Sequence, residues 1–305
     1  MGWIALAVVA ALAAALFGAW RYAHATNSVA LLDLADRVLA GSAGSPVAVK
    51  DARFGADPAQ RLDVIAPDAA GPHPVLVFIH GGGWHSGVPG EYGFIGRHFA
   101  RAGYLVVLPG YRLGGAGRYP HMLQDGAAAL AWVRANAARL GGDPQSVFVM
   151  GHSAGAYNAV MLALEPRWLA EAGVPQGFIK GVVGLSGPYD FYPFTSDSAR
   201  DAFGHVADPR TTQPVNHVSS NAPPMLLVTG DADETVKMRN SVALAGKLSA
   251  AGQPTEPVVL PGVDHAGPVL KLAAPFNRDR SVIDPVLAFL AKHGGASATV
   301  QAASR

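Results

Sequence analysis

The stretch Val147-Phe148-Val149-Met150-Gly151-His152-Ser153-Ala154-Gly155 decides the fold. Four apolar residues of strand character lead into a glycine-flanked serine, and residues 154–164 continue with the composition of a helix. A Gly-x-Ser-x-Gly pattern between a strand and a helix is typical of a sharp turn that exposes the serine hydroxyl, because glycines avoid Cβ clashes there. The sequence therefore predicts that Ser153 is a nucleophile. A turn with a capping serine would explain the glycines but not the motifs described below.

Apolar runs of strand length alternate with helical patterns on both sides of this stretch. The runs are rich in Val, Leu and Ile, as expected for strands covered on both faces. We expect such strands at residues 75–79, 104–108, 147–150, 181–185, 225–229 and 257–260, preceded by an antiparallel edge pair at 47–54 and 61–65. We expect helices at residues 92–102, 123–140, 154–164, 239–251 and 281–293. This order predicts an α/β fold, a mostly parallel twisted sheet with helices on both faces.

A second glycine-rich motif, His80-Gly81-Gly82-Gly83-Trp84, follows the strand predicted at 75–79. A serine nucleophile creates a tetrahedral oxyanion that needs hydrogen-bond donors. Consecutive glycines let backbone N–H groups approach a substrate closely. We therefore expect the N–H groups of Gly82, Gly83 and Ala154 to form an oxyanion hole. A phosphate site is excluded because the loop lacks the Gly-Lys-Ser/Thr of a P-loop.

A base and an acid should follow the serine in the chain order Ser, then Asp or Glu, then His. His265 follows the last predicted strand, at the same edge of the sheet as Ser153. Asp231, Asp233 and Glu234 all follow the strand before it, and the residue pattern does not choose among them. We expect His265 to take the serine proton while one carboxylate fixes its tautomer.

The composition excludes several other classes of function. The chain has 23 Lys and Arg against 22 Asp and Glu, for a formal net charge of +1, and no basic cluster that would bind nucleic acid. It has no cysteine, which excludes disulfides, thiolate metal sites and catalysis by cysteine. No His-Glu-x-x-His motif occurs, and glycines separate His80 from His85. We therefore expect no metal and no cofactor, and a structural role for His80 in its own loop.

The first residues differ in character from the rest of the chain. Residues 2–20 carry no charged side chain, and as a helix they would be about 28 Å long, close to the thickness of a bilayer core. Trp3 and Trp20 stand at the ends, as in an aromatic belt. We expect residues 1–25 to be an uncleaved membrane anchor with the catalytic domain in the periplasm or otherwise outside the cytoplasm. The alternative is a signal sequence cleaved after Ala23-His24-Ala25, followed by secretion.

The remaining chain is expected to form one catalytic domain. A short helix around residues 29–39 and a glycine- and serine-rich turn make residues 26–46 a linker. The domain then covers residues 47–293, and residues 294–305 form a frayed tail. Residues 190–224 mix aromatic, proline and polar residues without a period, so we expect them to cross the top of the sheet and shape a substrate pocket.

These motifs together resemble the α/β-hydrolase esterase/lipase family related to hormone-sensitive lipase. Within it the chain is similar to small bacterial carboxylesterases of the BD-FAE and arylformamidase-like type. The resemblance covers roughly residues 47–293 and rests on HGGGW at 80–84, Gly-Gly-Asp-Pro at 141–144, GHSAG at 151–155 and the late Asp and His. It implies an α/β-hydrolase fold with a small cap or none. The chain departs from the family at Gly110, where many relatives carry Asp or Asn before Tyr-Arg-Leu.

The resemblance also selects the acid. In the family the acid stands three positions after the glycine that ends the strand, in a Gly-x-x-Asp-x-x-Val pattern that maps onto Gly230, Asp233 and Val236. The implied triad is Ser153, Asp233 and His265, and the implied oxyanion donors are Gly82, Gly83 and Ala154.

The function implied is that of a serine carboxylesterase, which hydrolyses small acyl or aryl esters through an acyl-enzyme intermediate. The same triad would also cleave an amide, as an arylformamidase or a peptidase does, and the residue types do not separate these reactions. A third alternative is a membrane-tethered binding protein without catalysis. The presence of every triad and oxyanion residue argues against it.

Overall fold

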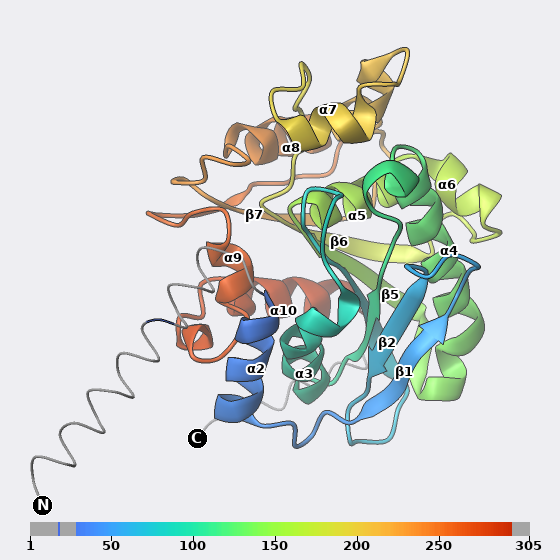
Figure 1. Ribbon diagram of the computed structural model, residues 1–305, viewed down its shortest axis with the longest axis vertical. Helices are drawn as coiled ribbons and strands as arrows, with labels where there is room; N and C mark the ends of the chain where they lie inside the picture. Colours follow the sequence, from blue (N-terminus) through green and yellow to red (C-terminus); the bar gives the residue numbers. More distant parts are fainter. Residues whose placement is uncertain (1–17, 19–28, 295–305) are drawn as a thin grey trace, which may run out of the picture.

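The computed structural model describes residue 18 and residues 29–294 (Figure 1). Its strands are β1 (Val47–Arg53), β2 (Arg61–Ile65), β3 (His73–Ile79), β4 (Leu105–Pro109), β5 (Gly142–His152), β6 (Ile179–Leu185), β7 (Met225–Gly230) and β8 (Val258–Leu260). They form one sheet in the order β1-β2-β4-β3-β5-β6-β7-β8. The pairs β1/β2 and β2/β4 are antiparallel and all other neighbours are parallel. The mostly parallel sheet and its antiparallel edge pair are therefore confirmed.

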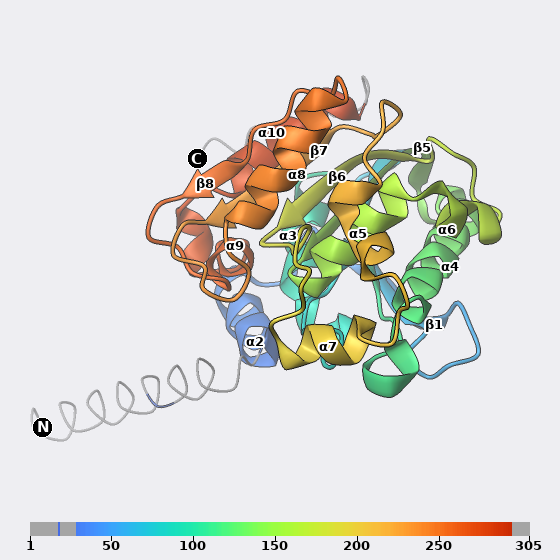
Figure 2. The ribbon, with the colours of Figure 1, turned by 90° about the horizontal axis from the view of Figure 1, so that it is seen from above.

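Helices cover both faces of this sheet, as predicted (Figure 2). They are α2 (Val29–Ala40), α3 (Gly93–Arg101), α4 (His121–Asn136), α5 (Ala154–Leu164), α6 (Pro166–Glu171), α7 (Asp197–Phe203), α8 (Arg239–Ala250), α9 (Gly267–Leu270) and α10 (Ile283–His293). Alternate residues of β3 divide between the two layers: Val75 and Val77 belong to the apolar layer that includes α4, α5 and α8, and Leu76 and Phe78 belong to the layer that includes α3 and α10. The fold is a sheet enclosed between two apolar layers.

Several helices differ from the sequence-based expectation. α4 ends at Asn136, and a 3-10 turn over Ala138–Leu140 completes the predicted helical stretch. Gly141 closes that turn in a left-handed conformation at φ +80°. The six-residue helix α6 was not predicted because it is too short to show a helical period. The segment expected to cross the top of the sheet contains α7, which supplies a small cap.

Residues 26–46 were expected to be a linker with a short helix. The short helix is present as α2, but it packs against α3. Its Asp33 and Asp36 are buried, and both pair with Arg97 of α3. A buried pair of carboxylates on one helix face needs a cationic partner, and Arg97 provides it from another element. Helix α2 is therefore part of the folded domain.

Some sequence-based expectations lie outside the described residues. These are, apart from Gly18, the anchor or signal sequence at 1–25 and, apart from Gly294, the tail at 294–305. Within the part of the chain that the structure describes, no helix is long and apolar enough to cross a bilayer.

Candidate active site

Ser153 stands at the turn between β5 and α5. Its backbone adopts φ +54° and ψ −122°, a conformation that side chains other than glycine rarely take. Its N–H donates a 2.8 Å hydrogen bond to the carbonyl oxygen of Leu185, at the end of the neighbouring strand β6. The sheet therefore fixes the strained turn from the side, and Ser153 lies at the carboxyl edge of the parallel strands.

The two glycines of this turn are required by close backbone contacts. A Cβ atom on Gly151 would lie 2.2 Å from the carbonyl oxygen of Gly155. A Cβ atom on Gly155 would lie 2.0 Å from the carbonyl oxygen of Ile79, at the end of β3. Helix α5 thus begins directly against the end of β3, which brings Ser153 beside the loop that follows that strand.

We expect Gly155→Ala to lower the free energy of unfolding by about 3 kcal/mol, because backbone rather than a movable side chain blocks the new methyl group. Gly246→Ala in α8 is the matched control, since a Cβ atom there meets nothing within 4 Å. Removing a glycine from a helix interior should stabilise the protein by up to about 1 kcal/mol. Urea denaturation measures both changes. A Gly155→Ala protein as stable as the wild type would show that the turn relaxes more easily than the structure indicates.

His265 connects Ser153 to a buried carboxylate. Its Nε2 atom lies 2.9 Å from the Oγ atom of Ser153, and its Nδ1 atom lies 2.8 Å from Oδ2 of Asp233. The other oxygen of Asp233 accepts backbone N–H bonds from Thr235 at 2.9 Å and Val236 at 2.8 Å. The structure thus brings together the three residues of the predicted triad, although they are far apart in the chain.

The neighbouring carboxylates do not reach His265. Oδ1 of Asp231 accepts the N–H of Gly262 at 2.7 Å, so Asp231 joins the two loops that follow β7 and β8. The side chain of Glu234 is 84% exposed and pairs with Lys237 at 2.8 Å. The side chain of Asp233 is fully buried. Of the three candidates that the residue pattern left open, only Asp233 touches the imidazole in the described structure.

Burial and hydrogen bonding act in opposite directions on Asp233. Burial by itself raises the pKa of this carboxyl group, but the hydrogen bond and positive charge of His265 and the N–H groups of Val236 and Thr235 outweigh it. The pKa of Asp233 is therefore below its ordinary value. Asp233 stays ionised at neutral pH, as a carboxylate that stabilises an imidazolium must.

The loop over residues 80–85, which we call the oxyanion loop, lies against Ser153. A Cβ atom on Gly81 would be 3.3 Å from the Cβ atom of Ser153. Gly82 adopts φ +109° and Gly83 φ +59°, conformations that favour glycine. The carbonyl oxygen of Gly82 accepts the N–H groups of His85 and Ser86, which closes a tight turn. Within residues 29–294, the N–H groups of Gly82 and Gly83 donate to no protein acceptor, so they are available to a substrate.

The buried side chain of His80 stabilises this loop. Its Nδ1 atom lies 2.8 Å from the carbonyl oxygen of Gly81. Its ring stacks on Tyr111 at 4.5 Å and on Tyr92 at 5.8 Å between centroids, and the hydroxyl of Tyr111 donates to the His80 carbonyl oxygen. Burial lowers the pKa of His80 to about 4. It is a neutral side chain that supports the loop, as the sequence predicted.

Gly110, where the chain departs from its relatives, has a local structural reason. A Cβ atom there would lie 2.5 Å from the carbonyl oxygen of Ala59, and the Gly110 N–H donates to the carbonyl oxygen of Arg61. The loop between β1 and β2 passes too close for a side chain. Glycine at position 110 is therefore explained by local packing, which does not involve the triad.

A family model decides the classification. The sequence model of the BD-FAE family matches residues 62–248, which is more than half of the chain.

This chain belongs to the BD-FAE family.

Curated relatives of this BD-FAE chain carry esterase names. Esterase LipC of Mycobacterium tuberculosis is 31% identical over 235 residues, covering 70% of this chain and 58% of LipC. The isoprenylcysteine alpha-carbonyl methylesterase ICME of Arabidopsis thaliana is 28% identical over 234 residues, covering 70% of this chain and 55% of ICME. The chain thus spans less than two thirds of the length of these relatives.

Solved structures share the fold. The thermostable carboxylesterase EstE1, cloned from a metagenomic library, superposes with a TM-score of 0.70 at 22% identity, covering 87% of this chain and 96% of EstE1. A truncated carbohydrate esterase from gut microbiota superposes with a TM-score of 0.71 at 19% identity, covering 84% of this chain and 98% of the other. At these identities the likeness shows the α/β-hydrolase fold, which confirms the fold that the sequence predicted.

The sequence missed one residue of the BD-FAE site. The Nε2 atom of His152 lies 2.9 Å from the carbonyl oxygen of His265, and the two rings are 5.0 Å apart between centroids. Burial, reinforced by the charge of His265, lowers the pKa of His152 to about 3. His152 is neutral and fixes the backbone of the residue that contacts Ser153. No signal in the sequence joins these two positions, which are 113 residues apart.

Acid is expected to destabilise this fold below about pH 6.5. Burial lowers the pKa of His80 and His98 to about 4 and that of His152 to about 3. These side chains stay neutral when folded, while the unfolded chain binds protons at its ordinary histidine pKa, so stability falls as the pH falls. The slope is roughly 1.4 kcal/mol per pH unit for each histidine. Urea titrations between about pH 7.5 and pH 4.5 measure it. A free energy of unfolding that stays constant from pH 6.5 to pH 5 would contradict this.

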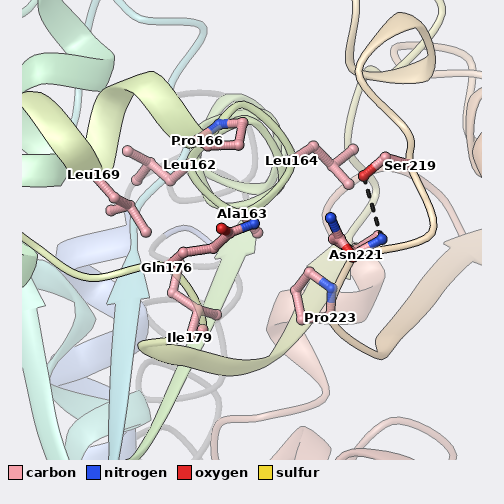
Figure 3. Close-up of a pocket in the computed structure, with 12 residues that line it drawn as sticks. Leu162, Ala163, Leu164, Pro166, Leu169, Gln176, Ile179, Ser219, Asn221 and Pro223 are labelled. Atoms are coloured by element: carbon pink, nitrogen blue, oxygen red, sulfur yellow. Dashed lines mark hydrogen bonds between the residues drawn. The ribbon is translucent and has the colours of Figure 1, made fainter.

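Two cavities lie outside the triad. One of about 60 Å³ lies at the opposite edge of the sheet, where Leu162, Leu169 and Ile179 face Ser219 and Asn221 (Figure 3). The other, of about 430 Å³, lies behind the oxyanion loop. None of the predicted site residues lines either cavity. In the described part of the chain, no group of three or more His, Asp or Glu side chains is placed to hold a metal ion.

Proposed function

We propose that this BD-FAE protein is a serine carboxylesterase that hydrolyses small acyl or aryl esters. The observation that carries the proposal is the contact of His265 with both Ser153 and Asp233, beside an oxyanion loop in which the N–H groups of Gly82 and Gly83 donate to no acceptor among the described residues. A serine becomes a nucleophile at neutral pH when an adjacent base accepts its proton. The relatives named as esterases, LipC and ICME, support the choice of an ester as the substrate.

The geometry accounts for both halves of the reaction. Nε2 of His265 accepts the proton as Oγ of Ser153 attacks the acyl carbonyl, and the N–H groups of Gly82, Gly83 and Ala154 stabilise the oxyanion. The imidazolium returns this proton to the departing alkoxide, which leaves an acyl-serine. Water then loses a proton to Nε2 of His265 as its oxygen attacks the acyl carbonyl. The bond between the acyl carbon and Oγ of Ser153 breaks, the imidazolium returns the proton to Oγ, and the acid is released. Throughout, Oδ2 of Asp233 accepts the hydrogen bond from the Nδ1–H of His265, so that Nε2 is the atom that takes up and returns the proton.

A substrate screen tests the proposal against its alternatives. Nitrophenyl esters of increasing acyl length, an aryl formamide and a short peptide would be compared on the wild type and on Ser153→Ala. We expect turnover of esters that depends on Ser153. If only the formamide or the peptide were turned over, we would conclude that the substrate is an amide and not an ester. The absence both of turnover and of labelling by a fluorophosphonate would favour a binding protein.

We also propose that residues 1–25 anchor the protein in a membrane with the catalytic domain outside the cytoplasm. The support is the uncharged stretch 2–20 with tryptophans at its ends. Alkaline extraction of membranes separates an inserted chain from a peripheral one, and protease added to intact cells reports the side of the domain. Recovery of a soluble chain that begins after Ala25 would show cleavage and secretion instead.

A further inference from the structure

Helix α2 touches two separate parts of the molecule that lead into the site. One is α3, which begins directly after the turn Pro89–Tyr92. The other is the segment 266–274, which follows His265. Both contacts come from the buried, acidic face of α2, and one residue, Asp36, makes both of them.

Asp36 is 2% exposed, and both of its oxygens are used. Oδ2 accepts from Nε of Arg97 at 3.0 Å and from Nη2 at 2.6 Å. Oδ1 accepts the backbone N–H of Ala274 at 2.9 Å. This contact is costly to open in a dry interior, because Nε of Arg97 and the N–H of Ala274 would each lose the acceptor that Asp36 provides, although Nη2 of Arg97 also donates to Asp33.

The Arg97 side of this contact leads to the oxyanion loop. Arg97 lies on α3, and Tyr92, which immediately precedes α3, is buried and stacks on His80. His80 in turn directly precedes the glycines of the oxyanion loop and contacts the carbonyl oxygen of Gly81. The approach of α2 to α3 is tight, since a Cβ atom on Gly93 would lie 2.8 Å from Oδ1 of Asp33. A movement of α3 relative to α2 would therefore displace Tyr92 and His80, which support the oxyanion loop.

The Ala274 side leads to the base. Ala274 is nine residues after His265 in the chain, and the segment between them contains α9. Leu272 and Ala273 are fully buried, so the segment is packed into the same apolar layer as α3. The carbonyl oxygen of His265 is fixed at the other end by His152. The segment is thus held at both ends, at His265 by His152 and at Ala274 by Asp36.

We propose that Asp36 is a positioning residue that holds the His265 segment in register with α3 and, through it, with the oxyanion loop. The inference rests on the proposed function, because it concerns the alignment of the base with the oxyanion donors. Displacement of a catalytic group by about 1 Å can cost about a hundredfold in rate. The contact therefore acts on the rate of the chemical step more than on substrate binding.

Asp36→Asn tests this in the full-length protein. Asparagine keeps the shape but has one acceptor oxygen, so it can serve Arg97 or the Ala274 N–H but not both. We expect kcat for ester hydrolysis and the rate of Ser153 phosphonylation each to fall by about tenfold to a hundredfold. KM should change by less than about threefold. Asp33→Asn is the control, because Asp33 is also buried and binds the same Arg97, as well as Arg37, whereas the N–H of Ala274 donates to Asp36.

The comparison between Asp36→Asn and Asp33→Asn tests whether Asp36 positions the His265 segment. Asp33→Asn should lower the melting temperature about as much as Asp36→Asn while keeping kcat within about threefold of the wild type. Equal losses of kcat in the two variants, or a loss confined to KM, would overturn the inference. In either case a wild type that hydrolyses esters through Ser153 would leave the proposed function intact.

A measurement on the wild type covers the case in which Asp36→Asn does not fold. Phosphonylation of Ser153 occupies the site covalently, and coupling between two sites is reciprocal. Amide hydrogen exchange in peptides that cover residues 29–40 and 266–276 should slow together after labelling, while the region of the 60 Å³ cavity stays unchanged. Slower exchange in residues 266–276 without any change in α2 would overturn the inference.

Discussion

Ser153→Ala is expected to lower kcat for ester hydrolysis by about a millionfold, to the residual level that binding and oxyanion contacts supply without a nucleophile. The reason is that the 2.9 Å contact from Oγ to Nε2 of His265 has no substitute. Within the described residues, no other hydroxyl lies within hydrogen-bond distance of that imidazole nitrogen. Steady-state rates on a short nitrophenyl ester, with labelling by a fluorophosphonate, measure the loss.

Ser186→Ala is the matched control for this variant. Ser186 also has a left-handed backbone, at φ +49°, and it directly follows β6, the neighbour of the strand β5 that precedes Ser153. Its hydroxyl is buried and has no hydrogen-bond partner in the described structure, so removing it should change kcat by less than about tenfold. If Ser153→Ala retained wild-type turnover, or Ser186→Ala abolished labelling, Ser153 would not be the nucleophile.

Asp233→Asn is expected to lower kcat by about ten thousandfold while the protein remains folded. The carboxylate accepts the Nδ1 proton of His265 at 2.8 Å, whereas the amide group of asparagine can present N–H there and favour the wrong tautomer. The remaining contacts of the side chain, to the N–H groups of Thr235 and Val236, would orient the asparagine oxygen toward the backbone. The rate loss should therefore appear in kcat and leave KM nearly unchanged.

Two neighbouring carboxylates provide the comparison. Glu234→Gln should be indistinguishable from the wild type, because that side chain is exposed and its partner is the surface residue Lys237. Asp231→Asn should lose less than about tenfold, because Asp231 orders the backbone at Gly262 and does not contact His265. A larger loss in either variant than in Asp233→Asn would transfer the role of the acid to that residue.

The lowered pKa of Asp233 determines how it acts under acid conditions. Because the folded pKa is below that of the unfolded chain, its stabilising contribution is complete above the unfolded pKa and disappears as the pH falls through the folded value. The buried histidines act at higher pH, between about 6.5 and 4. The loss of stability on mild acidification is therefore assigned to the histidines, before Asp233 takes up a proton.

Local features of the sequence determined the fold class and the nucleophile. The strand, the glycine-flanked serine and the helix are adjacent in the chain, and α5 begins and ends where its residue pattern predicted. Parallel strands place their carboxyl ends at one edge of the sheet, so the order of the motifs also predicted that Ser153, the oxyanion loop and His265 would meet. Residue patterns are sufficient here because apolar runs and glycine positions are local properties.

Tertiary structure decided which distant groups touch. The residue pattern left Asp231, Asp233 and Glu234 open, and the family resemblance favoured Asp233, but its contact with His265 exists only because the loops after β7 and β8 fold together. The contacts of His152 with His265 and of Asp36 with Ala274 join residues 113 and 238 positions apart. Such contacts depend on how helices and strands pack in three dimensions, which no local period encodes.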